Sequence, residues 1–215
     1  MFFVILIAIV VYRCLVLEKF GFKFTDSDQS IMWLGLVDYS NGVFHEPRFY
    51  GQSYNTMFES LLAVPLYKMG IPVYKALPII TSVLTLLPFL FLSGVTYLKQ
   101  KPYIAILILT IPILLPVEYA LITTISRGFV TGTFVASVAS LCLFYPSKKW
   151  FFLFGVLSVL AYSINPNSVV ISLACAAFLF FENFKSKPFY LFTGTGAGIG
   201  AIIHLLFARF YWVNP

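Results

Sequence analysis

The sequence contains few charged residues for its length. Only 10% of its 215 residues are charged, 14 Lys or Arg and 8 Asp or Glu, whereas 60% are hydrophobic. A soluble globular protein has about 25% charged residues, because its surface faces water. This chain cannot cover such a surface, which excludes a soluble enzyme and a disordered protein. Its basic residues form no dense run, so we expect no nucleic-acid partner; in a membrane protein they indicate topology instead.

Cysteine is also scarce. Three cysteines are present, and each of them lies inside an apolar run: Cys14, Cys142 and Cys175. No two of them form a C-x-x-C pair. The sequence therefore indicates neither a disulfide framework nor a zinc site.

Long apolar runs dominate the chain. A helix that spans a membrane needs about 20 mostly apolar residues. We predict an all-α polytopic membrane protein, a single module over 1–215 with seven transmembrane helices. The segment 18–73 is too polar for lipid and too apolar for disorder, so we assign it to the first extracytoplasmic loop, with amphipathic juxtamembrane helices. The predicted spans are 2–17, 74–98, 103–118, 129–146, 151–165, 168–182 and 189–211.

Basic residues lie in three short connectors between the predicted spans. Loops of this kind stay on the cytoplasmic side of a membrane. With seven spans all three connectors share that side. This places the N-terminus in the cytoplasm of a multi-pass protein of the plasma (inner) membrane, with 18–73, 119–128 and the 165–167 turn outside. The lysine pairs that support this prediction are Lys99 and Lys101, Lys148 and Lys149, and Lys185 and Lys187.

The stretch 54–69 permits a competing count of spans. As an eighth span it would place the segments before and after it on opposite sides of the membrane. The stretch is short, and it contains Glu59 and Pro65. We therefore expect a helix that lies in the interface of the outer leaflet.

The first loop holds six of the eight acidic residues. Asp26 and Asp28 directly precede an amphipathic helix, predicted over 30–39 and ending at Asn41-Gly42. One interpretation is helix capping, since Thr25-x-x-Asp28 fits a loose capping box. The other is an acidic pair at the membrane surface. There one carboxylate accepts a proton from a hydroxyl, or the two share a divalent cation such as Mg²⁺ or Mn²⁺.

A second polar cluster follows at 45–55. Its side chains can donate and accept hydrogen bonds, and its aromatic rings can stack on a sugar. The alternative is a polar loop that contacts lipid headgroups. Glu59, in the apolar helix that comes next, is costly if it faces lipid, so we expect it to face the polar loop or to snorkel. The candidate binding residues in the cluster are Arg48, Tyr50, Gln52, Tyr54 and Asn55.

Other polar residues lie near the ends of the later spans. Arg127, at the outer end of the fourth span, either binds a phosphate through a bidentate contact or anchors to headgroups. Arg209, near the outer end of the last span, either serves a site or snorkels. Glu118 lies at the mouth of the second outer loop. The glycines spaced by four in 194–200 predict close helix packing rather than a nucleotide loop.

The order of these features resembles the amino-terminal half of the GT-C superfamily of polytopic glycosyltransferases. A first span, a D-x-D loop and an amphipathic helix precede the stretch Tyr50-Gly-Gln-Ser-Tyr-Asn-Thr-Met-Phe-Glu-Ser-Leu-Leu62. Then come Pro-Leu-Tyr-Lys-Met-Gly and a further span. The topology is similar over nearly the whole chain, and the sequence is similar within 24–70.

The resemblance implies an inverting glycosyltransferase that works on the extracytoplasmic side. The donor would be a polyprenyl-phosphate sugar and the acceptor a glycan, lipid or protein. The catalytic acid of the first loop corresponds to Asp28 or Asp26, and we prefer Asp28 because it adjoins the amphipathic helix. The second outer loop lacks D-x-D and D-x-E, and offers Glu118 and Arg127 instead. Such enzymes continue beyond the seventh span, so we expect a longer enzyme or a partner subunit.

Two other classes of function remain open. A transporter or flippase of lipid-linked sugars would need polar residues at mid-depth in several spans, and the predicted spans contain few. A non-catalytic membrane subunit or scaffold would use the first-loop acids only to cap helices.

Overall fold

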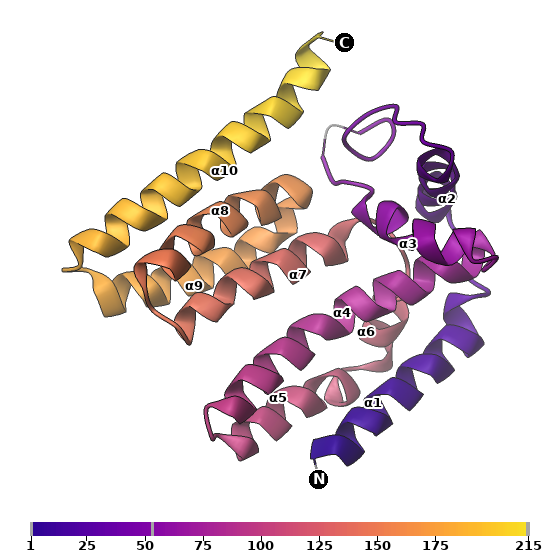
Figure 1. The fold of residues 1–215 in the computed structure, drawn as a ribbon. Coiled ribbons are helices and arrows are strands. Elements are labelled where there is room, and N and C mark those ends of the chain that lie inside the picture. Colours follow the sequence, from indigo (N-terminus) through magenta and orange to yellow (C-terminus); the bar gives the residue numbers. More distant parts are fainter. Residues whose placement is uncertain (1, 53, 214–215) are drawn as a thin grey trace. The chain divides into compact units, whose positions relative to one another are not determined.

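The computed structural model describes residues 2–52 and 54–213. Within these ranges the chain has no strand and is 79% helical, which confirms the all-α fold class (Figure 1). Of the predicted features, Ser53 in the polar cluster and the two residues after Val213 lie outside the described residues. The chain divides into two compact units, Met1–His45 with Met57–Val130, and Glu46–Thr56 with Thr131–Pro215.

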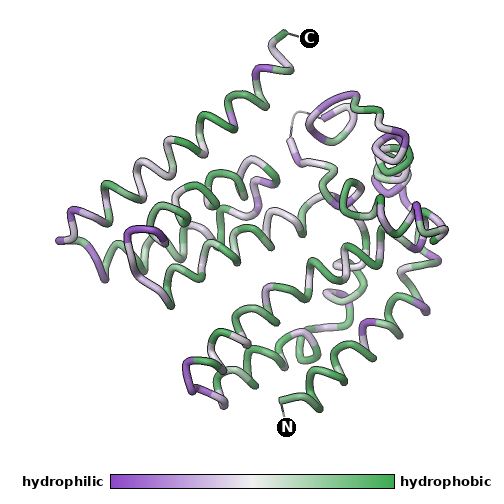
Figure 2. Tube along the Cα trace, viewed as in Figure 1, coloured by the Kyte–Doolittle hydropathy of each residue, from purple (hydrophilic) through white to green (hydrophobic). Residues whose placement is uncertain are grey.

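Every segment predicted to span contains a helix. Among the described residues, three helices are long and apolar enough to cross a membrane, which indicates a membrane protein. They are Val73–Leu98, Pro166–Asn183 and Lys187–Val213. Figure 2 shows hydrophobic residues along these helices and hydrophilic residues at many of the connections between helices. The other four spans stay a prediction.

The first unit contains the helices α1 to α6. In this unit α4 packs against α5 and α3, and α1 packs against α5. The apolar residues Ile9, Leu86 and Leu109 form a core between α1, α4 and α5. The elements are α1 (Phe2–Val16), a π-helical turn η1 (Leu17–Gly21), α2 (Ser27–Ser40), α3 (Phe58–Lys68), α4 (Val73–Leu98), α5 (Pro102–Leu114) and α6 (Val117–Ile122).

The predicted helices of the first outer loop are present. Buried residues of α2 recur at Gln29, Met32 and Leu36, which gives the helix one covered face, and the helix ends at Ser40 before Gly42 as expected. Gly42 has φ +75°, a left-handed conformation that glycine adopts readily. The helix α3 covers the later part of the predicted helix 54–69, and it is not among the three candidate spans.

The third predicted span, 103–118, is wrong in extent. The helix α5 ends at Leu114, and the short helix α6 begins only at Val117. Leu115 is extended because the residue before a proline, here Pro116, is disfavoured in the α conformation. The predicted outer loop 119–128 therefore begins with helix.

The second unit is built around two helices packed at close range. The helix α8 runs along α10 over much of its length. A Cβ atom on Gly196 would lie 2.1 Å from the carbonyl oxygen of Phe152, and one on Gly155 would lie 2.3 Å from that of Thr193. Only glycine fits at such a contact. The elements are α7 (Phe129–Ala139), η2 (Ser140–Leu143), α8 (Lys148–Ile164), η3 (Pro166–Ser168), α9 (Val169–Asn183) and α10 (Lys187–Val213).

The predicted glycine packing is half correct. Gly196 and Gly200 are buried against α8, as the spacing predicts. Gly194 and Gly198 have no atom within 4 Å of an added Cβ, so the prediction is wrong for this pair. The two pairs lie on different faces of α10, and only one face meets α8.

Candidate functional site

Asp26 begins the helix α2. Its Oδ1 accepts a hydrogen bond from the backbone N–H of Gln29 at 2.8 Å, so Asp26 is the N-cap. The capping interpretation is therefore right for Asp26, although the proposed box with Thr25 as the cap is wrong. The N-cap carboxylate also lies at the positive end of the helix dipole, where an acidic side chain stabilises a helix.

The second oxygen of Asp26 pairs with Arg127. The guanidinium donates to Oδ2 through Nε at 3.1 Å and also through Nη2. This two-pronged contact fixes the plane of the guanidinium. The pair is partly open to solvent, with 39% of the Arg127 side chain and 21% of the Asp26 side chain exposed. Two predicted site residues that are far apart in the sequence thus meet, both within the first unit.

Asp28 lies in the first turn of α2 and is half-buried. Its carboxylate makes no hydrogen bond or ion pair with any residue in the ranges 2–52 and 54–213. It therefore retains all of its acceptor capacity. The two aspartates differ clearly: Asp26 is engaged by protein donors on both oxygens, whereas Asp28 is available to a ligand.

Glu59 lies in the first turn of α3 and is fully buried. Its Oε2 accepts a hydrogen bond from the Thr81 hydroxyl of α4 at 2.7 Å, and that hydroxyl also contacts Ser126 Oγ. Burial raises the pKa of the Glu59 carboxyl from 4.5 to about 7, although Thr81 and the backbone amides of Gly128 and Val130 oppose the rise. Because it is fully buried, Glu59 is not a snorkelling surface acid.

The segment from Thr123 to Gly128 joins these two contacts. Ser126 meets Thr81 next to Glu59, and the following residue, Arg127, pairs with Asp26. Gly128 then turns the chain into α7 with φ +82°, a conformation that a side chain would strain. Neighbouring residues of this segment thus contact Thr81, the partner of Glu59, and Asp26. We call the set Asp26, Asp28, Glu59, Thr81, Ser126 and Arg127 the acidic site.

The remaining predicted residue of the first unit is Glu118. It is exposed in the first turn of α6 and has no hydrogen bond with a residue in the described ranges. The helix α6, which the sequence did not predict, carries it. Its proposed contact with a substrate stays a prediction.

From Glu46 onward, the second polar cluster belongs to the second unit. The backbone N–H of Arg48 donates to the Tyr211 hydroxyl of α10 at 2.9 Å, and Arg48 is buried. Asn165 Nδ2 donates to Asn55 Oδ1, which connects the loop to the N-cap residue of η3. Tyr50 and Gln52 are half-buried. The last two predicted residues, Tyr54 and Arg209, are exposed.

A metal ion would need more ligands than the two aspartates provide. Asp26 is occupied by Gln29 and Arg127, which leaves Asp28 as the only open carboxylate of the pair. The part of the chain that the structure describes contains no group of three His, Cys, Asp or Glu side chains able to hold a metal ion. The divalent cation suggested by the sequence stays a prediction.

The sequence analysis missed Arg13, Thr81 and Ser126. Arg13 is a charged residue inside an apolar span, and such residues usually serve a function or pair with a partner. This signal was present in the sequence. Thr81 and Ser126 carried no comparable signal, because isolated hydroxyls are common in membrane helices.

Comparison of the chain with protein-family models, with curated proteins and with solved structures finds no match. The expected relationship to the GT-C superfamily therefore rests on the residues and on the topology alone.

Proposed function

We propose that the protein is a membrane glycosyltransferase that uses a polyprenyl-phosphate sugar as donor. The observation that supports this most directly is the unpaired carboxylate of Asp28, two residues from the Asp26–Arg127 pair. Hydroxyl attack on a sugar phosphate needs a base and a cation to stabilise the leaving phosphate; Asp28, without a partner among the described residues, and the fixed guanidinium of Arg127 supply these two kinds of group. The three apolar helices indicate a membrane protein, and a polyprenyl-phosphate donor is found in a membrane.

In the proposed reaction Asp28 accepts the proton of an acceptor hydroxyl. The hydroxyl oxygen forms a bond to the anomeric carbon while the bond from that carbon to the phosphate oxygen breaks. The electron pair of the broken bond stays on the polyprenyl phosphate, and the configuration at the sugar is inverted. Arg127 stabilises the charge on the departing phosphate, and Asp26 holds its guanidinium in place.

Glu59 takes a supporting role in this proposal. Its buried carboxyl anchors Thr81 and, through it, Ser126, the residue before Arg127. We do not assign it a contact with the substrate, because its side chain is fully buried. The proposed orientation follows from the positions of the lysine connectors: seven spans, with these connectors in the cytoplasm and the acidic site outside.

The experiment measures release of polyprenyl phosphate by the purified protein from a panel of polyprenyl-phosphate sugars, with and without a chelator. We expect Asp28→Asn to lower the rate by about 10²–10⁴-fold, the usual contribution of a general base. Glu182→Gln is the matched control, since it removes one exposed carboxylate outside the candidate site residues. A rate for Asp28→Asn equal to the wild type would refute the assignment of the base.

A non-catalytic subunit is the second candidate. It is favoured by the double engagement of Asp26, which both caps α2 and braces Arg127 as a purely structural residue would. This function predicts that no sugar donor is consumed, and that Asp26→Ala lowers stability while Asp28→Asn changes nothing. Donor turnover that depends on Asp28 would reject it.

A further inference from the structure

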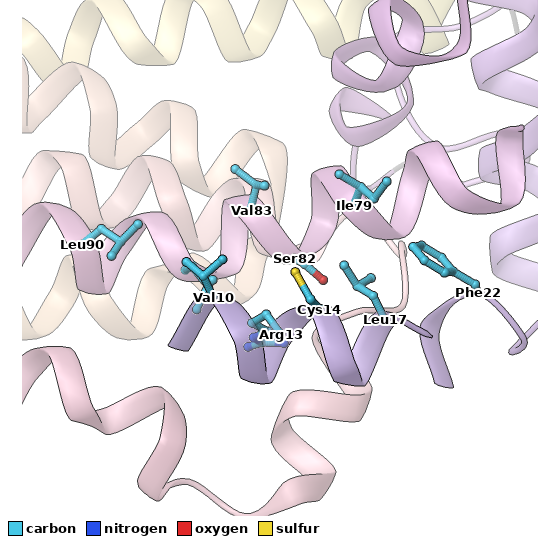
Figure 3. A pocket seen from close by; sticks show the side chains of 10 residues that line it. Val10, Arg13, Cys14, Leu17, Phe22, Ile79, Ser82, Val83 and Leu90 are labelled. Carbon is cyan, nitrogen blue, oxygen red and sulfur yellow. The ribbon is translucent and has the colours of Figure 1, made fainter. Parts of the chain in front are cut away.

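A cavity of about 470 Å³ lies between α1 and α4 in the first unit. Figure 3 shows side chains of both helices around it. The polar residues Arg13 and Ser82 belong to its wall, which is otherwise almost entirely apolar. Its buried residues include Arg13, Ser82 and Leu86, and the exposed ones include Val10, Cys14 and Val83.

Arg13 uses only part of its hydrogen-bonding capacity. The side chain is 2% exposed, and Nη1 donates to the carbonyl oxygen of Ala120 at 3.1 Å and to Thr123 Oγ1 at 3.0 Å. Nε and Nη2 have no partner among the described residues, and neither does the hydroxyl of Ser82. In arginine side chains generally, the edge formed by Nε and Nη2 can bind two oxygens of one phosphate at once.

A buried guanidinium without a counter-charge is costly. Removing such a charge from water is repaid only when a partner of opposite charge satisfies its donors. No acidic residue lines this cavity in the described part of the chain. An anion from outside the chain would supply the counter-charge that the lining residues lack.

The shape and lining of the cavity restrict the kind of anion. α4 is one of the candidate spans, and Val83, Leu86 and Leu90 of α4 extend the apolar wall away from Arg13. A small hydrated anion would lose water along this wall and gain nothing in return. An amphiphile instead buries its chain there, which contributes about 0.8 kcal/mol for each CH₂ group.

We propose that this cavity binds one anionic membrane phospholipid, with its phosphate on the Nε and Nη2 edge of Arg13 and an acyl chain along α4. A second cation supports an anionic ligand. Lys75 Nζ lies 5.7 Å from the ring centroid of Phe22, and Phe22 also lines the cavity. The proposal does not depend on the transferase function, because none of the residues of the acidic site lines this cavity.

Native mass spectrometry of the purified protein in detergent tests the proposal. Phosphatidylglycerol is the anionic probe, and phosphatidylcholine is the zwitterionic probe with the same acyl chains. We expect one phosphatidylglycerol to bind about tenfold more tightly than phosphatidylcholine, a difference of about 1.4 kcal/mol. Sodium phosphate at the same concentration should not compete with it.

Two variants locate the binding. Arg13→Gln should remove the preference for phosphatidylglycerol, whereas Lys149→Gln, which removes an exposed charge of α8, should keep it. Val83→Trp should fill the cavity from its rim and weaken binding of both lipids while leaving Arg13 in place. Because Val83 is 47% exposed, this variant keeps the fold even if Arg13→Gln does not.

Three outcomes would overturn the proposal. Equal binding of the two lipids to the wild type would remove the role of the charge. Unchanged binding in Val83→Trp would place the lipid elsewhere. Competition by sodium phosphate would identify the ligand as a soluble anion rather than a phospholipid.

Discussion

The two compact units hold their helices together by different means. In the first unit, side chains of α1, α3 and α4 make hydrogen bonds at buried positions, as Arg13, Glu59 and Thr81 do. In the second unit, α8 and α10 approach so closely at Gly155 and Gly196 that backbones touch. Helices in a membrane lack a hydrophobic drive to associate, so either polar contacts or close packing must replace it. The second unit also has polar contacts, such as Ser163 Oγ with His204 Nδ1 at 2.9 Å. The buried charged side chains Arg13 and Glu59, however, lie in the first unit, which contains the acidic site.

This comparison predicts that the second unit is the more sensitive to added volume. In Gly196→Ala the new Cβ would lie 2.1 Å from the Phe152 carbonyl, which is backbone and cannot turn aside. We expect a loss of about 3 kcal/mol or more in the free energy of unfolding, the upper end of the range for overpacking. Gly198→Ala is the control, since its Cβ has open space. Unfolding temperatures in detergent measure both, and equal values would contradict the packing.

The first unit should instead be sensitive to pH through Glu59. The folded state raises the pKa of Glu59 from 4.5 to about 7, so it holds the proton more tightly than the unfolded state does. The contribution of Glu59 to stability is therefore present in full below pH 4.5 and is lost as the pH rises to 7. The loss amounts to about 3 kcal/mol at 1.36 kcal/mol for each pKa unit.

Glu59→Gln should remove this dependence. The measurement is the unfolding temperature of wild type and variant between pH 4.5 and 8, and the difference between the two curves isolates Glu59. Glu118→Gln, at an exposed position, should follow the wild-type curve. Parallel curves for Glu59→Gln and the wild type would mean that the carboxyl is not buried as described.

The difference between the units also explains what the sequence could predict. Helix positions could be predicted from apolar runs, because a segment in lipid must satisfy its backbone hydrogen bonds internally, as a helix does. The glycines of 194–200 predicted close packing. The four-residue spacing fits both Gly194/Gly198 and Gly196/Gly200, however, and does not indicate which face of α10 meets α8. The end of α5 was missed, even though Pro116 marks it, because apolar character continues past the break.

Pairing of distant residues could not be predicted in this way. Asp26 and Arg127 were both candidates, yet nothing in their local sequence links a residue before α2 to one after α6. For Glu59 the sequence suggested a position facing the polar loop or a snorkelling acid, and it gave no sign of the contact with Thr81 of the next helix. Such contacts depend on how helices pack, which periodicity leaves open.

A polar contact in the second unit offers a sharper test of the comparison. Asn165 donates to Asn55, and Asn55 has φ +62°, where alanine is strained. We expect Asn55→Ala to cost about 1–2 kcal/mol, from one lost hydrogen bond and the strain. Asn55→Gly relieves the strain, so it should cost less than Asn55→Ala. Chemical denaturation measures both variants. A loss as large as that of Gly196→Ala would show that the second unit also depends on polar contacts.

The smallest expected effect concerns the Asp26–Arg127 pair. Its side chains are partly exposed, and pairs of this kind contribute about 0–1 kcal/mol. Asp26→Asn keeps a good N-cap residue, so a double-mutant cycle with Arg127→Gln measures the pair alone. We expect a coupling energy of about 0.5 kcal/mol in the stability of the protein. If donor turnover shows a much larger coupling in the same cycle, the pair serves to orient Arg127 rather than to hold the first unit together. Equal coupling in both measurements would instead assign Asp26 and Arg127 to the structural contacts of that unit.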